Sequence, residues 1–353
     1  MSINMAIIGM GGMGVWHFDR VTKQIPGIKI VGAYDIRQEI KDAIEARGIK
    51  NYPDPEAIYA DKNVDLVLIA TPNDVHKSYS INCLNAGKHV VCEKPVTLNA
   101  AELEEVIAVA KKTGKLFTVH QNRRWDRDYQ TIQKILSDGL LSNPYFIESR
   151  VQGSRKGMFG WRAFKPNGGG MVLDWGIHLI DQIMDLVDDK VASVYANLHY
   201  IGTKEVDDNF TTILRFERGL TALVNISMNC FILQPRWHMS CEDGTAVIEA
   251  GWKNNGKIVK LADTTELDWS DAIVYTDAGP TRSMLPRPKE TTLELELPEG
   301  NRNWTEYYEN VIDVINGKAD KPIVTTDQAL RVMKVIDAVF ESDKIGAAVT
   351  RLI

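Results

Sequence analysis

Two residue types able to move a proton stand four positions apart near the middle of the chain. Three glycines, Gly168 to Gly170, lead into a largely apolar run that carries Asp174 and His178. On a helix, residues at this spacing are neighbours on one face. A carboxylate beside an imidazole can fix the ring's tautomer and raise its basicity, which suits a general base. Taken alone, the stretch favours the alternative interpretation, a structural histidine bonded to a nearby aspartate.

Lys94 is a second candidate for chemistry. It stands between Glu93 and Pro95, after the predicted strand His89–Cys92. Held near a reacting oxygen, a lysine ammonium can donate a hydrogen bond and stabilise the negative charge that develops there. The alternative is a solvated lysine paired with Glu93, and the local sequence by itself favours it.

The elements that would position these groups begin with a glycine-rich turn. An apolar strand, Met5–Ile8, leads into Gly9-Met10-Gly11-Gly12-Met13-Gly14, and a helix from Val15 to about Gln24 follows. This order of strand, Gly-x-Gly-x-x-Gly and helix is typical of dinucleotide binding. The glycines allow a tight turn, close approach of the pyrophosphate and close packing of the helix. The helix N-terminus would hold the phosphates.

An acid at the expected spacing supports the same interpretation. Asp35 follows the strand Ile28–Tyr34, at the place where a carboxylate accepts hydrogen bonds from the adenosine ribose. Its negative charge favours NAD, because NADP carries a phosphate on that ribose. Arg37, two residues later, keeps NADP as an alternative. A glycine-rich turn beside a surface acid is the structural alternative.

The first third of the chain continues as alternating strands and helices. Further strands are predicted at Val64–Ala70, His89–Cys92 and Leu116–Val119, separated by the helix candidates Gln38–Arg47, Val75–Ala86 and Ala100–Thr113. This pattern predicts a doubly wound parallel sheet. Ligands of such sheets bind beyond the carboxyl ends of the strands, so we expect one crevice lined by Thr71, Asn73, Lys94, Gln121, Asn122 and Arg123.

The rest of the chain predicts a second α/β unit. Strands are expected at Tyr145–Gln152, Val191–Ile201, Phe210–Phe216, Leu220–Met228 and Met239–Cys241, and their alternation implies one face packed on helices. An open sheet face is often covered by a twin subunit, so we expect a homodimer or homotetramer. We place a cofactor domain at 1–122 and a substrate and oligomerisation domain at 123–353. The role of the irregular stretch 264–302 stays open.

A loop rich in glycines and aromatic residues precedes the Asp–His stretch. It runs from Arg155 to Arg162 and suggests a segment over the site. Trp161 could stack on a sugar ring there, and Arg162 could reach a cofactor phosphate or carboxamide. A surface loop with a tucked tryptophan is the alternative. Trp237 is a similar stacking candidate from a later strand.

Composition and charge exclude several classes of function. The net charge is −6 at pH 7, which argues against nucleic acid as a partner, because phosphate binding needs a basic surface. No apolar run is long enough to span a membrane, and the first residues lack the basic start of a signal peptide. The four cysteines show no metal-ligand spacing and are expected to be reduced, so we expect a cytoplasmic protein without a metal.

In order and spacing, several motifs resemble the Gfo/Idh/MocA oxidoreductases. They are Gly9–Gly14, Ala70-Thr71-Pro72-Asn73 with His76, Cys92-Glu93-Lys94-Pro95, and Gly169-Gly170 followed by Asp174 and His178. The resemblance covers essentially the whole chain. It implies a Rossmann domain followed by an α/β domain on a large, mostly antiparallel open sheet, with the last helices packing back near the first domain. It also implies oxidation or reduction of a sugar or polyol with NAD(P).

Carried over residue by residue, the resemblance implies a site. Lys94, Asp174 and His178 would be catalytic, and the Lys94–Pro95 bond would be cis. The expected substrate residues are Lys94, Arg123, Trp161, Asp174, His178, Asp181 and Trp237. The expected cofactor residues are Gly9, Gly11, Gly12, Met13, Gly14, Asp35, Ile36, Arg37, Ala70, Thr71, Pro72, Asn73, His76, Glu93, Lys94, Asn122, Trp161 and Arg162.

The expected function is oxidation of a ring hydroxyl of a sugar, glycoside or polyol with NAD. His178 would take the hydroxyl proton, Lys94 would stabilise the oxyanion and Asp174 would orient His178, although Lys94 and His178 could exchange roles. The stretch Val119–Asp126 looks like a subgroup that includes glycoside 3-dehydrogenases, which favours C3 of a glucoside. Alternatives are a myo-inositol or aldose dehydrogenase, an NAD-retaining enzyme that cleaves a glycoside through transient oxidation, and a non-catalytic sugar or nucleotide sensor.

Overall fold

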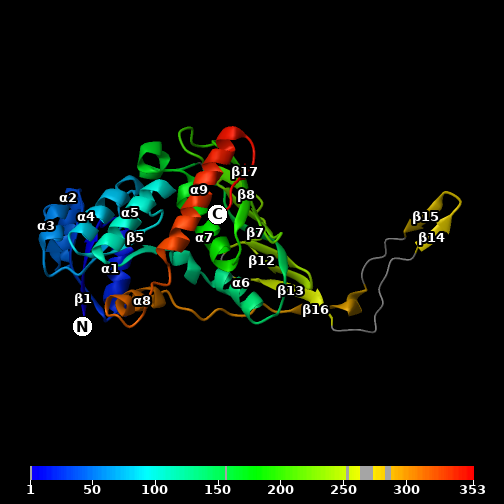
Figure 1. Cartoon of the computed structure of the whole chain (residues 1–353), viewed down its shortest axis with the longest axis horizontal. Coiled ribbons are helices and arrows are strands. Elements are labelled where there is room, and N and C mark those ends of the chain that lie inside the picture. Colours follow the sequence, from blue (N-terminus) through cyan, green and yellow to red (C-terminus); the bar gives the residue numbers. More distant parts are fainter. Residues whose placement is uncertain (1, 156, 252–253, 263–272, 283–287) are drawn as a thin grey trace.

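Two large sheets organise the chain, with helices packed against each of them (Figure 1). The computed structural model describes residues 2–155, 157–251, 254–262, 273–282 and 288–353. Across these ranges, none of the helices combines the length and the apolar character needed to cross a membrane.

The first sheet has six strands in the order β3-β2-β1-β4-β5-β6, all parallel. The strands are β1 (Ile3–Ile8), β2 (Ile28–Tyr34), β3 (Lys50–Asn51), β4 (Leu66–Ile69), β5 (His89–Glu93) and β6 (Phe117–His120). Every residue of β4 is buried, which explains its unbroken apolar sequence. The strand order reverses between β1 and β4, so a ligand crevice is expected at their carboxyl ends. The predicted doubly wound parallel sheet is confirmed.

Five helices connect these strands within the described residues. They are α1 (Gly12–Gln24), α2 (Gln38–Ala46), α3 (Pro55–Ala60), α4 (His76–Asn85) and α5 (Ala100–Thr113). Local sequence sets the two ends of α5. The side chain of Asn99 caps the start by accepting from the backbone N–H of Glu102, and Gly114 ends the helix in the left-handed conformation, at φ 64°. The short α3, capped by Asp54, is absent from the sequence prediction.

The second sheet has nine strands in the order β16-β13-β12-β11-β7-β10-β9-β8-β17. They are β7 (Pro144–Gln152), β8 (Val191–His199), β9 (Asn209–Phe216), β10 (Thr221–Ser227), β11 (Trp237–Cys241), β12 (Gly244–Ile248), β13 (Gly256–Leu261), β16 (Thr292–Leu295) and β17 (Val349–Thr350). Strands β7 and β10 pair in parallel, and the other neighbours pair antiparallel. The predicted large, mostly antiparallel sheet is confirmed.

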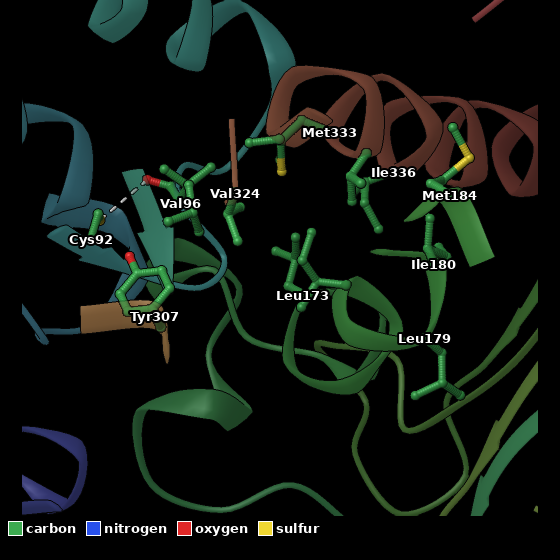
Figure 2. Packing of buried hydrophobic residues seen from close by; sticks show 14 of the residues in the cluster. Cys92, Val96, Leu173, Leu179, Ile180, Met184, Tyr307, Val324, Met333 and Ile336 are labelled. Atoms are coloured by element: carbon green, nitrogen blue, oxygen red, sulfur yellow. Dashed lines mark hydrogen bonds between the residues drawn. The ribbon is translucent and has the colours of Figure 1, made fainter. Parts of the chain in front are cut away.

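Helix α9 (Thr326–Ile345) links the two halves. It packs on β8 and on α7 (Ile177–Leu186), and also on α5 and β6 of the first half. Apolar side chains fill the α7–α9 contact, and Figure 2 shows Leu173, Ile180 and Met184 facing Met333 and Ile336. Helix α6 (Arg127–Ser137) follows β6, and α8 (Thr305–Ile315) lies beside α1 in Figure 1, where Tyr308 contacts His17.

A hairpin of β14 (Ile273–Thr276) and β15 (Gly279–Arg282) stands away from both sheets in Figure 1. It belongs to the stretch 264–302 that the sequence marks as irregular. Within that stretch, 264–272 and 283–287 lie outside the described residues. From 288 onward the chain forms β16 and then leads to α8.

Candidate active site

A π-helical turn, η5 (Val172–Gly176), carries Asp174 at the entry to α7. Gly170, at φ 103°, brings the chain into it in a conformation that favours glycine. Asp207 closes its start by accepting hydrogen bonds from two backbone N–H groups (2.8 and 2.9 Å). A π turn bonds residues five apart instead of four, so the segment that carries Asp174 departs from the regular α-helix that the sequence predicts.

Lys94 reaches this turn from the end of β5. Its Nζ donates to the backbone oxygen of Asp174 (2.8 Å) and to the carboxylate Oδ1 (3.1 Å). Arg162 Nε donates to the same Oδ1 (3.1 Å). Burial would raise the pKa of Asp174, but the two cations outweigh burial and hold that pKa below its ordinary value. The Lys94–Pro95 peptide bond is cis, in agreement with the resemblance.

His178 lies in the first turn of α7 and is buried, with 4% of its surface exposed. Its Nδ1 has no hydrogen-bond partner among the described residues. Burial lowers the pKa of His178 well below the ordinary 6.5, and the charges of Lys94 and Arg123 lower it further. The ring is therefore neutral at pH 7 and able to accept a proton.

The expected contact between Asp174 and His178 is replaced by another. The carboxylate of Asp174 accepts hydrogen bonds from Lys94 and Arg162. Within the described part of the chain, the Nδ1 of His178 has no hydrogen-bond partner. The prediction that Asp174 orients His178 is therefore not supported by the geometry. Asp174 acts on Lys94 instead, because the π turn aims both its carbonyl and its carboxylate at the ammonium.

Glu93, expected at the cofactor, lies in a buried polar cluster under Lys94. Its Oε1 is bonded to His17 Nε2 (2.7 Å) and to His120 Nδ1 (2.8 Å), and its Oε2 accepts from the Lys94 backbone N–H (3.2 Å). Tyr308 Oη lies 2.7 Å from His17 Nδ1. We call Glu93, His17, His120 and Tyr308 the Glu93 cluster. The last three are not among the residues expected from the sequence, although a histidine on the inner face of α1 and another at the end of β6 were available signals.

The glycine turn leaves an open cradle at the start of α1. Gly9 has φ 95°, and a Cβ on Gly14 would collide with the Gly9 carbonyl oxygen, so both positions need glycine. Beside Gly12 there is open space. Gly11 precedes the helix without a side-chain cap, and the first turn holds no acid. The first N–H groups are thus available to an anion, which fits the pyrophosphate of a dinucleotide.

Asp35 lies beside this cradle, after β2. Its carboxylate accepts from Arg37 Nε (3.0 Å) and Nη2 (3.1 Å), and from the backbone N–H of Met10 (3.0 Å). Burial would raise the pKa of Asp35, but these donors keep it below its ordinary value. The side chain of Arg37 is half-exposed and Ile36 is exposed. The pair offers an acceptor to a ribose hydroxyl and a cation to a 2′-phosphate, so it fits both NAD and NADP.

Two residues expected at the cofactor hold the loops around the crevice. Asn73 Nδ2 donates to the backbone oxygen of Gly168 (2.8 Å), which ties the end of β4 to the glycines before η5. His76 is buried, with its ring nitrogens 3.0 Å from the Thr71 oxygen and 2.8 Å from the Pro95 oxygen. Burial lowers the pKa of His76. Both side chains therefore stabilise the backbone of the loops that line the site.

Unpaired polar atoms occur at the positions expected to meet ligands. Thr71 Oγ1, Asn122 Oδ1 and His178 Nδ1 are buried and lack a hydrogen-bond partner in the described ranges. Buried polar atoms are normally bonded, so these three are candidates to contact a bound molecule. The ring of Trp161 lies 4.4 Å from the Arg162 guanidinium, which in turn contacts Asp174.

The polar atoms of two expected substrate residues are bonded to other side chains of the protein. Asp181 is buried and accepts from Arg124 through both carboxylate oxygens (2.7 and 2.8 Å). Trp237 is fully buried, and its Nε1 donates to Asp128 (2.9 Å). Neither presents a free polar edge or ring face to a sugar, so the structure does not support these two assignments. Arg123 remains close to the site, as its charge acts on His178.

Comparisons with known proteins agree with this geometry. Residues 3–121 match the GFO/IDH/MocA model described as an oxidoreductase family with an NAD-binding Rossmann fold, and residues 129–247 match the GFO/IDH/MocA C-terminal domain. The chain is 28% identical to scyllo-inositol 2-dehydrogenase (NADP(+)) IolW of Bacillus subtilis, over 97% of this chain and 94% of that protein. It is 27% identical to myo-inositol 2-dehydrogenase of Thermotoga maritima, over 64% and 68%.

A solved structure shows the same architecture. An NAD-binding protein from Listeria innocua shares 40% sequence identity with this chain and superposes with a TM-score of 0.91, over 99% of both chains. The two family models together cover more than half of the chain, and the cradle and crevice described above fit them. The chain belongs to the GFO/IDH/MocA family of NAD(P)-dependent oxidoreductases.

Proposed function

We propose that this oxidoreductase converts a secondary ring hydroxyl of a cyclic polyol or sugar to a ketone, with NAD as the preferred cofactor. The observation that carries the proposal is that Lys94, bonded to the π turn at Asp174, lies near enough to the buried His178 for its charge to lower the pKa of that ring. Alcohol oxidation needs one group that takes the hydroxyl proton and another that stabilises the developing oxyanion. A neutral buried imidazole and a charged ammonium supply these two functions.

In the proposed mechanism, His178 accepts the proton of the substrate hydroxyl. Lys94 donates a hydrogen bond to the same oxygen, and Asp174 holds the ammonium in place through its carbonyl and carboxylate oxygens. A bound nicotinamide cofactor would supply the acceptor for the hydride of the carbon that carries this hydroxyl. The substrate thus loses one proton and one hydride, and the carbon–oxygen single bond becomes a double bond. Arg123 and Trp161 are proposed to contact the rest of the ring.

The cofactor would lie along the cradle. Gly9–Gly14 and the start of α1 would hold the pyrophosphate, and Asp35 would accept from the ribose hydroxyls. NADP would bind more weakly than NAD. The guanidinium of Arg37 can contact a 2′-phosphate only if it gives up its hydrogen bonds to Asp35. Thr71 and Asn122, with their unpaired oxygens, would contact the nicotinamide end.

Two substrate assignments differ only in which ring is oxidised. A cyclitol is supported by relatives that are named inositol dehydrogenases, including the two reported above. C3 of a glucoside, the assignment favoured by the stretch Val119–Asp126, remains a prediction. A panel of inositols, aldoses and glucosides, assayed for NADH and NADPH formation with product NMR, separates the two by the position of the carbonyl.

Two variants test the site itself. His178→Ala and Lys94→Met should each abolish most turnover while NAD binding, measured by calorimetry, is retained. Full turnover by His178→Ala on the substrate found in the panel would refute the assignment. Release of a free aglycone without net NADH would indicate glycoside cleavage instead, and ligand binding without turnover across the panel would indicate a sensor.

The expected homodimer or homotetramer also remains a proposal. Buried and exposed residues alternate along β8, so one side of the nine-stranded sheet is turned outward, and Tyr195 on this strand is 42% exposed. A twin subunit could cover this side. Light scattering that finds only a monomer at micromolar concentration would contradict the proposal.

A further inference from the structure

The Glu93 cluster is buried polar structure to which the proposed chemistry gives no role. We propose that Glu93, His17, His120 and Tyr308 form a positioning unit that holds Lys94 where its ammonium can meet the substrate oxygen. The inference rests on the proposed function, because it assumes that Lys94 contacts the reacting oxygen. It adds residues that touch neither substrate nor cofactor and act through Lys94.

The cluster joins four elements that are distant in sequence. Glu93 ends β5, His17 lies in the cofactor helix α1, His120 ends β6 and Tyr308 lies in α8. At most 4% of each residue is exposed. The ring of Trp16 packs edge-on against His17 at 5.0 Å, and further aromatic side chains of α8 pack around both histidines. Water is therefore excluded, and hydrogen bonds in such surroundings are strong and costly to break.

The protonation states follow from the bonding pattern. Burial would raise the pKa of Glu93, but its bonds and charge interactions with His120 and His17 hold that pKa well below its ordinary value. Burial lowers the pKa of His17 to about 4, so its ring is neutral and carries one N–H. A carboxylate only accepts hydrogen bonds, so this proton sits on Nε2 and donates to Glu93. The free Nδ1 then accepts from the Tyr308 hydroxyl.

Hydrogen bonds within the cluster account for the closeness of its nitrogen and oxygen atoms. The two histidines and Glu93 place their nitrogen and oxygen atoms within 4.8 Å of one another. However, Glu93 Oε1 is already at hydrogen-bond distance from both rings, and the second nitrogen of His17 is bonded to Tyr308. The groups are thus paired with one another by hydrogen bonds.

The cluster reaches Lys94 through one remaining bond. Glu93 Oε2 accepts from the backbone N–H of Lys94, while the Nζ of the same lysine donates to the π turn at Asp174. The lysine is held at both ends, by the cluster at its backbone and by the turn at its ammonium. Because a misplacement of about 1 Å can lower a rate by about 100-fold, the backbone anchor matters for chemistry.

Glu93→Gln tests the anchor directly. A carboxamide has a single acceptor oxygen, and its NH2 would face a donor, so the three bonds of Glu93 cannot all be kept. We expect kcat to fall by about 10- to 100-fold, while the Kd for NAD and the KM for substrate change by less than about twofold. Circular dichroism and the melting temperature establish that the variant is folded.

Two paired variants separate positioning from a general structural role. His17→Gln keeps an N–H donor near the place of Nε2, and His17→Leu removes it. We expect the glutamine variant to retain most of the kcat that the leucine variant loses, although both remove the same ring. Tyr308→Phe removes only the hydroxyl that donates to His17 Nδ1, and it should also lower kcat while leaving the Kd for NAD unchanged.

A histidine at the other end of the same strand provides the matched control. His89 begins β5, and its Nδ1 accepts from the backbone N–H of Leu116 (3.0 Å). His89→Asn should alter the melting temperature at most and leave kcat at the wild-type value. If Glu93→Gln and His17→Leu change kcat no more than this control does, the inference is overturned. A fall in kcat that only parallels losses of stability and NAD affinity also overturns it.

Lys94→Met distinguishes failure of the inference from failure of the proposed function. If Lys94→Met keeps its turnover, Lys94 does not contact the reacting oxygen, and both fall. If Lys94→Met is inactive while Glu93→Gln retains wild-type kcat, only the positioning unit is refuted. Inactivity of Lys94→Met together with a kcat-specific loss in Glu93→Gln supports both.

Discussion

The ion pair of Lys94 and Asp174 allows a quantitative test of the site. Its charged atoms are 3.1 Å apart, and the two side chains are 13% and 20% exposed. At an effective dielectric constant of about 20, unit charges at that distance attract by about 5 kcal/mol. Removing both ions from water offsets part of this attraction. We therefore expect a coupling free energy of about 2–3 kcal/mol between the two side chains.

A double-mutant cycle with Lys94→Met and Asp174→Asn, measured by urea unfolding at pH 7, gives this coupling. Each single variant leaves a charge without its main partner and should cost about 3 kcal/mol, and the double variant should cost less than the sum. The exposed pair Lys257–Glu294 is the control, with an expected coupling of about 0.5 kcal/mol or less. A Lys94–Asp174 coupling no larger than the control would refute the arrangement.

The same pair predicts a pH dependence of stability. The pKa of Asp174 is lowered in the folded protein, so the contribution of its carboxylate is complete above the unfolded-state pKa of about 3.9. It disappears as the pH falls through the lower folded-state pKa. The destabilisation caused by Asp174→Asn should therefore shrink in acid, and a destabilisation independent of pH would contradict the ionised pair.

Other predictions concern the base, the cradle and a corrected residue. The acid limb of the kcat/KM profile should lie below pH 6.5, because burial and nearby cations lower the pKa of His178. Arg123→Gln removes one of these cations and should move the limb to higher pH. A limb that stays in place in this variant would exclude His178 as the base. Gly14→Ala should abolish NAD binding or folding, because its Cβ would meet a carbonyl oxygen, whereas Gly153→Ala, in open space, should leave calorimetric NAD affinity unchanged. Trp237→Phe should lower the free energy of unfolding by about 1–3 kcal/mol without raising the substrate KM, and a large rise in KM would return this ring to the sugar site.

Elements built from local pattern could be predicted from the sequence. The buried strands β1, β4 and β5 are short apolar runs, and the glycine turn and Asp35 have fixed places relative to them. Strand order alone then brings Lys94 to the edge where the crevice opens. The sequence predicts that the second sheet is large and mostly antiparallel, but it does not predict all of its strands. Strands such as β12 and β13 are short and partly exposed, so their pattern is weak.

Features that depend on distant partners could not be predicted in this way. Asp181 and Trp237 look available in the sequence, but their partners Arg124 and Asp128 lie 57 and 109 residues away. The Glu93–His17 bond spans 76 residues. No local periodicity reports such pairings, since they arise only when separate elements pack together. A residue type that could bind a ligand can equally be satisfied by the protein itself.

The π turn was also beyond local pattern, because packing helps to set it: a Cβ on Gly176 would stand 2.7 Å from the Phe210 ring. The turn has a consequence for sequence variation at position 174. Of the two hydrogen bonds that the Lys94 ammonium donates to Asp174, one goes to the main-chain carbonyl, a group that all twenty amino acids supply. Side-chain exchange at this position can therefore erase the carboxylate but never the carbonyl. A change of helical register, such as the deletion of one residue within η5, would let that oxygen accept a backbone N–H of the helix, and the hydrogen bond from Lys94 would be lost.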